Sequence, residues 1–309
     1  MKTIKLFLIF TFSSFLINAQ KELVQITHER KNDNSINFLY NCNNHGYYYV
    51  KLKFPFLQNS SYFSKGHNIY GHLGTLTTLK PIKIDQPINF QYSYVFWKGK
   101  GLKDYKNMQQ YLMPYNEGKK VRVNYVNHLN QIIEKKVPDS WIAYGFNSSA
   151  PDSIIATRKG MVVEVTNSYK NDTTTNFIYT KSRNEIIVEH EDGTLGKYVG
   201  FEFNKINVKA GDVVFPGSFL GVVGREGTDP ENYQLIFSLY YLNIGNMTSE
   251  GGSDGQFGIN YTCVAPKFYN EGKHEHLVPG IYEVKHDQNI IMSEMSKKEK
   301  KQFLEKASK

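Results

Sequence analysis

Hydrophobic and polar positions along this chain alternate in short runs, which is typical of β-strands. Residues 47–54 alternate in part before a proline, and residues 88–96 alternate more cleanly. Successive strand residues point to opposite faces, so alternation indicates a strand with one buried face. Turn-forming residues separate the runs at 41–46, 59–74 and 98–101. This spacing of short strands predicts a β-sandwich domain over residues 20–115.

The second half of the chain is denser in strand patterns, and glycines punctuate it as they do in all-β regions with tight turns. Strands are predicted at 121–123, 161–165, 185–188, 195–203, 219–223 and 234–240. We expect a Gly- and Ser-rich loop at 247–260 and one or two closing strands within 261–284. Ser296 and Glu299 have the spacing of a capping box, so a short helix is predicted from Ser296 in the Lys-rich tail.

Composition adds little to this picture. Aromatic residues make up 14% of the 309 residues, which favours β structure, and 21% charged residues are normal for a globular protein. The formal net charge of +8 comes in part from the tail, and we interpret it as a solvated surface. Nothing in the sequence resembles a nucleic-acid-binding module.

The first residues predict export. Lys2 and Lys5 precede an apolar run at 6–16, and the small residue Ala19 follows. This order is typical of a cleaved secretory signal peptide, here 1–19, and the run is short for a membrane anchor. We therefore expect a periplasmic or secreted protein without a transmembrane segment after cleavage. A disulfide between Cys42 and Cys263 is chemically possible there, and the sequence leaves it open.

The most specific motif is V-x-x-G-D-x-V-x-x-G-x-x-L-G-x-x-G at 208–224. Gly211 with Asp212 suits a tight hairpin turn, and Gly217 tolerates a positive φ. Biotinyl and lipoyl carrier domains share such a motif, but their modifiable-lysine tripeptide is absent. Residues 155–165 and the I-I-V-E-H-E-D-G-T segment at 186–194 flank the motif in the order found in LytM-type (M23 family) zinc peptidases. The chain resembles this family over roughly 140–242.

The resemblance implies an all-β fold, in which a β-sandwich precedes a degenerate M23-type duplicated-hybrid-motif domain at 116–245. Closing strands and a short C-terminal helix follow at 246–309. It also implies where zinc chemistry would lie. The ligand Asp corresponds to Gly145, the ligand His of the H-x-H motif to Ile236, and the first His of that motif to Gln234. The His of the Y-x-H-L segment corresponds to Gly200, and His128 is the nearest upstream histidine for the remaining ligand.

Gly145 and Ile236 carry no side-chain lone pair, and the Gln234 amide is no base near neutral pH. A catalytic zinc ion needs three protein ligands and an open position. We therefore expect no catalytic residue, metal or cofactor. His190 with Asp192 is interpreted as part of a hairpin turn, and the pair His274 and His276 as a solvated loop.

These expectations describe a non-catalytic envelope protein that binds peptidoglycan or regulates a cell-wall hydrolase. The expected binding surface is the former substrate groove, framed by Tyr144, Tyr198, Phe201 and Tyr233. The alternative is an active zinc metalloendopeptidase that cleaves peptidoglycan cross-link peptides with non-standard ligands. A third class is an adhesion or scaffold protein in which the groove has no role.

Overall fold

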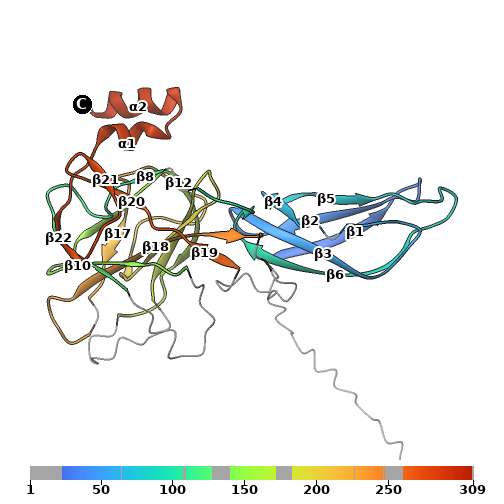
Figure 1. The fold of residues 1–309 in the computed structure, drawn as a ribbon, viewed down its shortest axis with the longest axis horizontal. Helices are drawn as coiled ribbons and strands as arrows, with labels where there is room; N and C mark the ends of the chain where they lie inside the picture. Colours follow the sequence, from blue (N-terminus) through green and yellow to red (C-terminus); the bar gives the residue numbers. More distant parts are fainter. Residues whose placement is uncertain are drawn as a thin grey trace, which may run out of the picture.

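The computed structural model describes residues 23–63, 65–106, 109–126, 140–171, 183–225, 227–245, 247 and 260–307. The predicted signal peptide, His128 and most of the expected Gly- and Ser-rich loop lie outside these ranges. Strands dominate the described residues, as predicted, and two short helices end them where one was expected (Figure 1). No helix in this part of the chain is long and apolar enough to span a membrane.

The N-terminal part forms a sandwich of two antiparallel sheets, drawn in blue and teal in Figure 1. One sheet holds β1 (Val24–Arg30), β2 (Ile36–Cys42) and β5 (Leu73–Leu79), and the other holds β4 (His67–Tyr70), β3 (Tyr47–Gln58) and β6 (Asn89–Lys98). Their inward side chains, among them Phe38, Val50 and Leu52, share one buried core. Strands β3 and β6 contain the two alternating runs of the sequence.

A large mixed sheet organises the second part, with the strand order β16-β12-β13-β14-β18-β10-β9-β22 among the described residues. These strands are β9 (Lys120–Tyr125), β10 (Tyr144–Ser148), β12 (Gly160–Thr166), β13 (Glu185–Glu189), β14 (Leu195–Val199), β16 (Val213–Val214), β18 (Tyr233–Asn243) and β22 (Gly280–Glu283). Two further strands, β7 (Gly101–Leu102) and β19 (Tyr261–Cys263), also pair with β18.

Two small sheets complete this part. One has the order β11 (Ser153–Ile155), β17 (Phe219–Val223) and β15 (Phe201–Ile206). The other has the order β21 (Lys273–Glu275), β20 (Lys267–Asn270) and β8 (Gln110–Tyr111). Through β7 and β8, residues 101–111 pair with strands of the second part, ahead of the domain boundary expected at residue 115.

The predicted strand at 195–203 is interrupted in the structure. Gly200 has φ +112°, which only glycine adopts readily, and it separates β14 from β15. After this break β15 joins a different sheet from β14. One glycine thus turns the chain from the large sheet into the small one.

The two parts meet in a junction that is partly apolar and partly charged. Tyr49 and Trp97 of the sandwich pack with Leu195 and other apolar side chains of the second part. The backbone N–H of Tyr47 donates a hydrogen bond to Oε2 of Glu189 over 2.8 Å. Lys98 and Glu164 form an ion pair across the same boundary.

The C-terminal tail folds into α1 (Gln288–Ser293) and α2 (Lys297–Ala307), seen in red in Figure 1. Ser296 and Glu299 form the predicted capping box, with Ser296 N donating to Glu299 Oε2 over 2.7 Å. Buried Arg158 anchors the tail by two bonds to the Glu294 carboxylate, of 2.7 and 2.8 Å. Cys42 and Cys263 are buried free thiols.

Candidate functional site

The four positions assigned to zinc chemistry lie together on neighbouring strands. Gly145 of β10 pairs directly with Ile236 of β18, and Ile236 pairs with Val199 of β14, the residue before Gly200. Gln234 lies two residues before Ile236 and pairs with Asn147. The alignment drawn from the motifs therefore selects residues that are adjacent in space.

Two of these positions present nothing that can bind a metal ion. Gly145 is buried and has no side chain, and the side chain of Ile236 is aliphatic. Zinc requires deprotonated sulfur, imidazole nitrogen or carboxylate oxygen ligands. Within the described ranges, no three His, Cys, Asp or Glu side chains converge as a metal site. The residues present here therefore do not fit a zinc ion.

Gly200 is constrained more strongly than Gly145. A Cβ atom on Gly200 would lie 2.4 Å from the backbone oxygen of Gln234, and the backbone already has a positive φ. A Cβ on Gly145 would instead meet the side-chain ends of Asn124 and Gln234, at 2.9 and 3.1 Å. Those side chains can move, but a strand backbone cannot move cheaply. The observed backbone thus excludes any side chain at position 200.

A polar groove lies on the sheet face next to these positions. Its volume is about 590 Å³. Asn124 of β9, Asn147 of β10 and Gln234 of β18 contribute carboxamides to it, and Gln234 Nε2 donates to Asn147 Oδ1 over 3.4 Å. Carboxamides both donate and accept hydrogen bonds, so this surface matches a peptide backbone or another amide-rich ligand.

The aromatic residues expected to frame the groove do not line it. Tyr144, Tyr198 and Phe201 are at most 1% exposed and belong to the core beneath the sheet, and half-buried Tyr233 packs against the same core. The reason is strand alternation: Tyr144, Phe237 and Tyr198 form one cross-strand row, and Gly145, Ile236 and Val199 form the next, on the opposite face. The sequence prediction placed these side chains on the wrong face.

The buried tyrosines have structural roles instead. The hydroxyl of Tyr198 accepts a hydrogen bond from Thr157 N over 2.9 Å and contacts Thr157 Oγ1 at 2.7 Å. Burial raises the pKa of both Tyr198 and Tyr144 to about 12, so these phenols stay neutral. They support the groove from below and contribute no proton chemistry.

His190 and Asp192 lie in the β13–β14 hairpin turn, as the sequence interpretation has them. The Asp192 carboxylate accepts hydrogen bonds from Thr194 and from Arg158. His190 Nδ1 lies 2.7 Å from the carbonyl oxygen of Lys159, and burial lowers the pKa of this histidine to about 3. The pair therefore holds a turn, with a neutral imidazole in the core.

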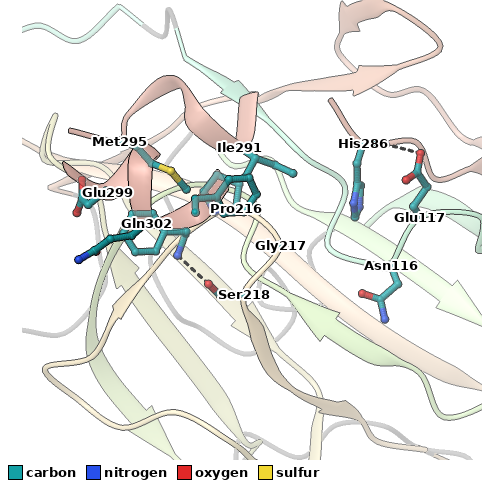
Figure 2. Close-up of a pocket in the computed structure, with 12 residues that line it drawn as sticks. Asn116, Glu117, Pro216, Gly217, Ser218, His286, Ile291, Met295, Glu299 and Gln302 are labelled. Carbon is teal, nitrogen blue, oxygen red and sulfur yellow. Dashed lines mark hydrogen bonds between the residues drawn. The ribbon is translucent and has the colours of Figure 1, made fainter. Parts of the chain in front are cut away.

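A second cavity, of about 580 Å³, shares no lining residue with the groove. Figure 2 shows it between the tail helices and the loop that includes Pro216, Gly217 and Ser218, with Ile291 and Met295 on the helical side. It results from the docking of the tail and contains none of the four positions assigned to zinc chemistry.

The sequence prediction missed Asn124 and Asn147 as groove residues. Asn124 lies on β9, one strand away from Gly145, so no linear motif contains it. Strand alternation could have identified Asn147, because it follows Gly145 by two residues and therefore shares its face of the sheet.

Similarity to known proteins is found among solved structures. No protein-family model matches the chain, and no similar protein is found among curated proteins. Among solved structures, a proposed glycyl-glycine endopeptidase lytM from Ruminococcus gnavus ATCC 29149 is 15% identical, with a TM-score of 0.27. That match covers 40% of this chain and 49% of the other, so the chain spans about half of that protein.

Two further solved structures are similar. The M23 metalloprotease pseudoalterin from the deep sea is 18% identical, with a TM-score of 0.31, and the match covers 57% of this chain and 99% of that one. A proposed M23 peptidase from Pseudomonas aeruginosa is 13% identical, with a TM-score of 0.25, over 62% and 82% of the two chains. Identities of at most 18% and TM-scores of at most 0.31 carry no conclusion about the activity of this chain.

Proposed function

We propose that this chain is an exported, non-catalytic M23-like envelope protein that binds peptidoglycan or regulates a cell-wall hydrolase. The observation that carries the proposal is the pairing of Gly145 with Ile236, where the resemblance requires two zinc ligands. Without those ligands no metal-bound water is generated, and the Gln234 amide supplies no base. The groove beside them has a volume of about 590 Å³ and is lined by carboxamide side chains.

The groove chemistry supports binding of a peptide-containing polymer. Asn124, Asn147 and Gln234 present carboxamides that can pair with the N–H and C=O groups of an extended peptide. Each such neutral hydrogen bond contributes about 0.5–1.5 kcal/mol. Several of them along a groove give moderate affinity, which suits a protein that holds a polymer without cleaving it.

The test uses the full chain after export, analysed for metal and incubated with isolated peptidoglycan. We expect no stoichiometric zinc, sedimentation with the polymer and no new amino termini in it. One zinc ion per chain together with cleavage of peptidoglycan peptides would establish the zinc metalloendopeptidase instead. Faster hydrolysis by an added cell-wall hydrolase, without sedimentation, would select the regulatory role.

Groove variants connect the binding to this site. Gln234→Ala removes one carboxamide from the groove and should weaken sedimentation roughly two- to tenfold, the equivalent of one neutral hydrogen bond. Asn207→Ala is the matched control, because Asn207 is exposed and lies outside the groove. Equal binding by both variants would remove the groove from the proposal.

A further inference from the structure

Charged side chains of opposite sign border the carboxamide floor of the groove. Lys120 and Arg122 project from β9, and Asp229 and Glu231 lie on the loop that leads into β18. All four are exposed and line the same cavity. Strand β10 lies between β9 and β18, so the strand that carries the basic side and the strand that the acidic loop enters are about two strand spacings, or ~10 Å, apart.

The geometry of the acidic side is fixed by the loop itself. Oδ1 of Asp229 accepts a hydrogen bond from the backbone N–H of Glu231 over 2.9 Å, which closes an Asx-turn. Arg225 and Tyr233 form a β-bridge at the base of the loop. The two carboxylates are therefore presented from a closed turn.

The basic side is fixed by strand pairing. Arg122 lies between Asn147 of β10 and Ile281 of β22, in direct cross-strand register with both. Lys120 faces Glu283 across the β9–β22 pair, and Glu283 also forms an ion pair with Lys285. The net charge of the side chains on this side therefore remains positive. Among the described residues, Arg122 forms no ion pair.

We propose that the groove selects an extended peptide that carries a carboxylate and an ammonium group, with the carboxylate at Arg122 and the ammonium group at Asp229 and Glu231. This inference rests on the peptide binding proposed above and adds the charge pattern of the ligand. The planar guanidinium of Arg122 suits a carboxylate, which accepts two parallel hydrogen bonds from it. The carboxamides between the two charged sides pair with the intervening peptide backbone.

The experiment compares three synthetic probes by titration calorimetry with the full chain. The first is N-acetyl-Lys-Ala-Ala with a free carboxylate and a free ε-amine, so that peptide backbone lies between the two charges. The second is its C-terminal amide, and the third its ε-N-acetyl derivative. We expect the free peptide to bind about three- to fivefold more tightly than either blocked form, as solvent-exposed charge pairs do, and this preference to shrink at high salt.

Variants assign each charge to its side of the groove. Arg122→Gln should abolish the effect of amidation and retain that of ε-acetylation, and the double variant Asp229→Asn, Glu231→Gln should do the reverse. Lys80→Gln and Asp85→Asn are matched controls on the sandwich, and both should retain the full preference.

The outcomes separate this inference from the proposed function. Equal binding of all three probes would refute the charge pattern and leave peptide binding intact. Failure of every probe to bind, with retained sedimentation on peptidoglycan, would also refute it, because the polymer would then be recognised by other groups. Failure of both probes and polymer would overturn the proposed peptidoglycan binding as well.

Discussion

Replacing Glu189 by glutamine should change how the stability of this protein depends on pH. Glu189 lies where the two parts of the chain meet, and it is only 6% exposed. Its Oε2 atom accepts the N–H of Tyr47, whereas its Oε1 atom has no hydrogen-bond partner among the described residues. Burial raises the pKa of this carboxyl to about 7, although the Tyr47 N–H and the Lys98 ammonium oppose the rise.

The sign and size of the effect follow from this raised pKa. The folded state holds the proton more tightly than the unfolded state, whose pKa is near 4.5. The contribution of Glu189 to stability is therefore fully present below pH 4.5 and is lost as the pH rises towards 7. The full difference corresponds to at most about 3 kcal/mol, and roughly 2 kcal/mol of it falls between pH 5 and 8.

Glutamine keeps an oxygen that accepts the Tyr47 N–H but does not titrate. The assay is urea-induced unfolding of the native chain and of Glu189→Gln at pH 5, 6, 7 and 8. The native chain should lose roughly 2 kcal/mol relative to the variant across this range. Other groups, including His190, titrate in both proteins, so their contributions cancel in the difference.

Glu191→Gln is the control, because Glu191 is exposed two residues further along the chain. Its difference from the native chain should stay nearly flat across the same pH range. A flat difference for Glu189→Gln as well would refute the reasoning, because the buried carboxylate would then be as well solvated in the junction as in the unfolded chain.

Three other substitutions test the fold around the site and the tail. Glu294→Ala should lower the free energy of unfolding, measured in urea, by about 3 kcal/mol, because it leaves buried Arg158 without its bidentate partner. Glu305→Ala is the control: it removes an exposed ion pair and should change this free energy by less than about 1 kcal/mol. Gly200→Ala should destabilise by at least about 1 kcal/mol, from its positive φ and its contact with a backbone oxygen; a neutral result would contradict the constraint. Ser296→Ala should reduce helicity at the C-terminus, measured by circular dichroism, with a loss of about 1 kcal/mol from the cap, and unchanged helicity would remove the capping role.

The sequence allowed the three longest strands, β3, β6 and β18, and several shorter ones to be predicted, because alternation and turn residues are local signals. Strands β1, β2, β5 and β10 were not singled out. Strand β17 matches the predicted 219–223, and β12 and β13 extend their predicted ranges by one or two residues. The capping box at Ser296 was likewise predictable, since its two residues are three apart. Helix α1 has no such pair, and its N-cap, Asp287, was not singled out.

The site was predictable in position but not in composition. Family motifs selected Gly145, Gln234 and Ile236, which the sheet does bring together. Which face a side chain occupies depends on registers between strands that are distant in sequence. Tyr144 was therefore assigned to the groove, although it is Gly145, the next residue of β10, that lies on the groove face. Likewise, the strand break at Gly200 depends on a backbone oxygen contributed by β18, which no local pattern encodes.

The turn at Gly200 also limits which residues this position can accept. A histidine codon at this position would require a side chain where the chain of β18 already passes, with the backbone in a conformation that histidine disfavours. A substitution at Gly145 faces no barrier of that kind, since the atoms nearest to its Cβ belong to the side chains of Asn124 and Gln234. A histidine at position 200 would thus require the corner between β14 and β15 to be rebuilt first, so this position accepts a side chain only together with a change of backbone.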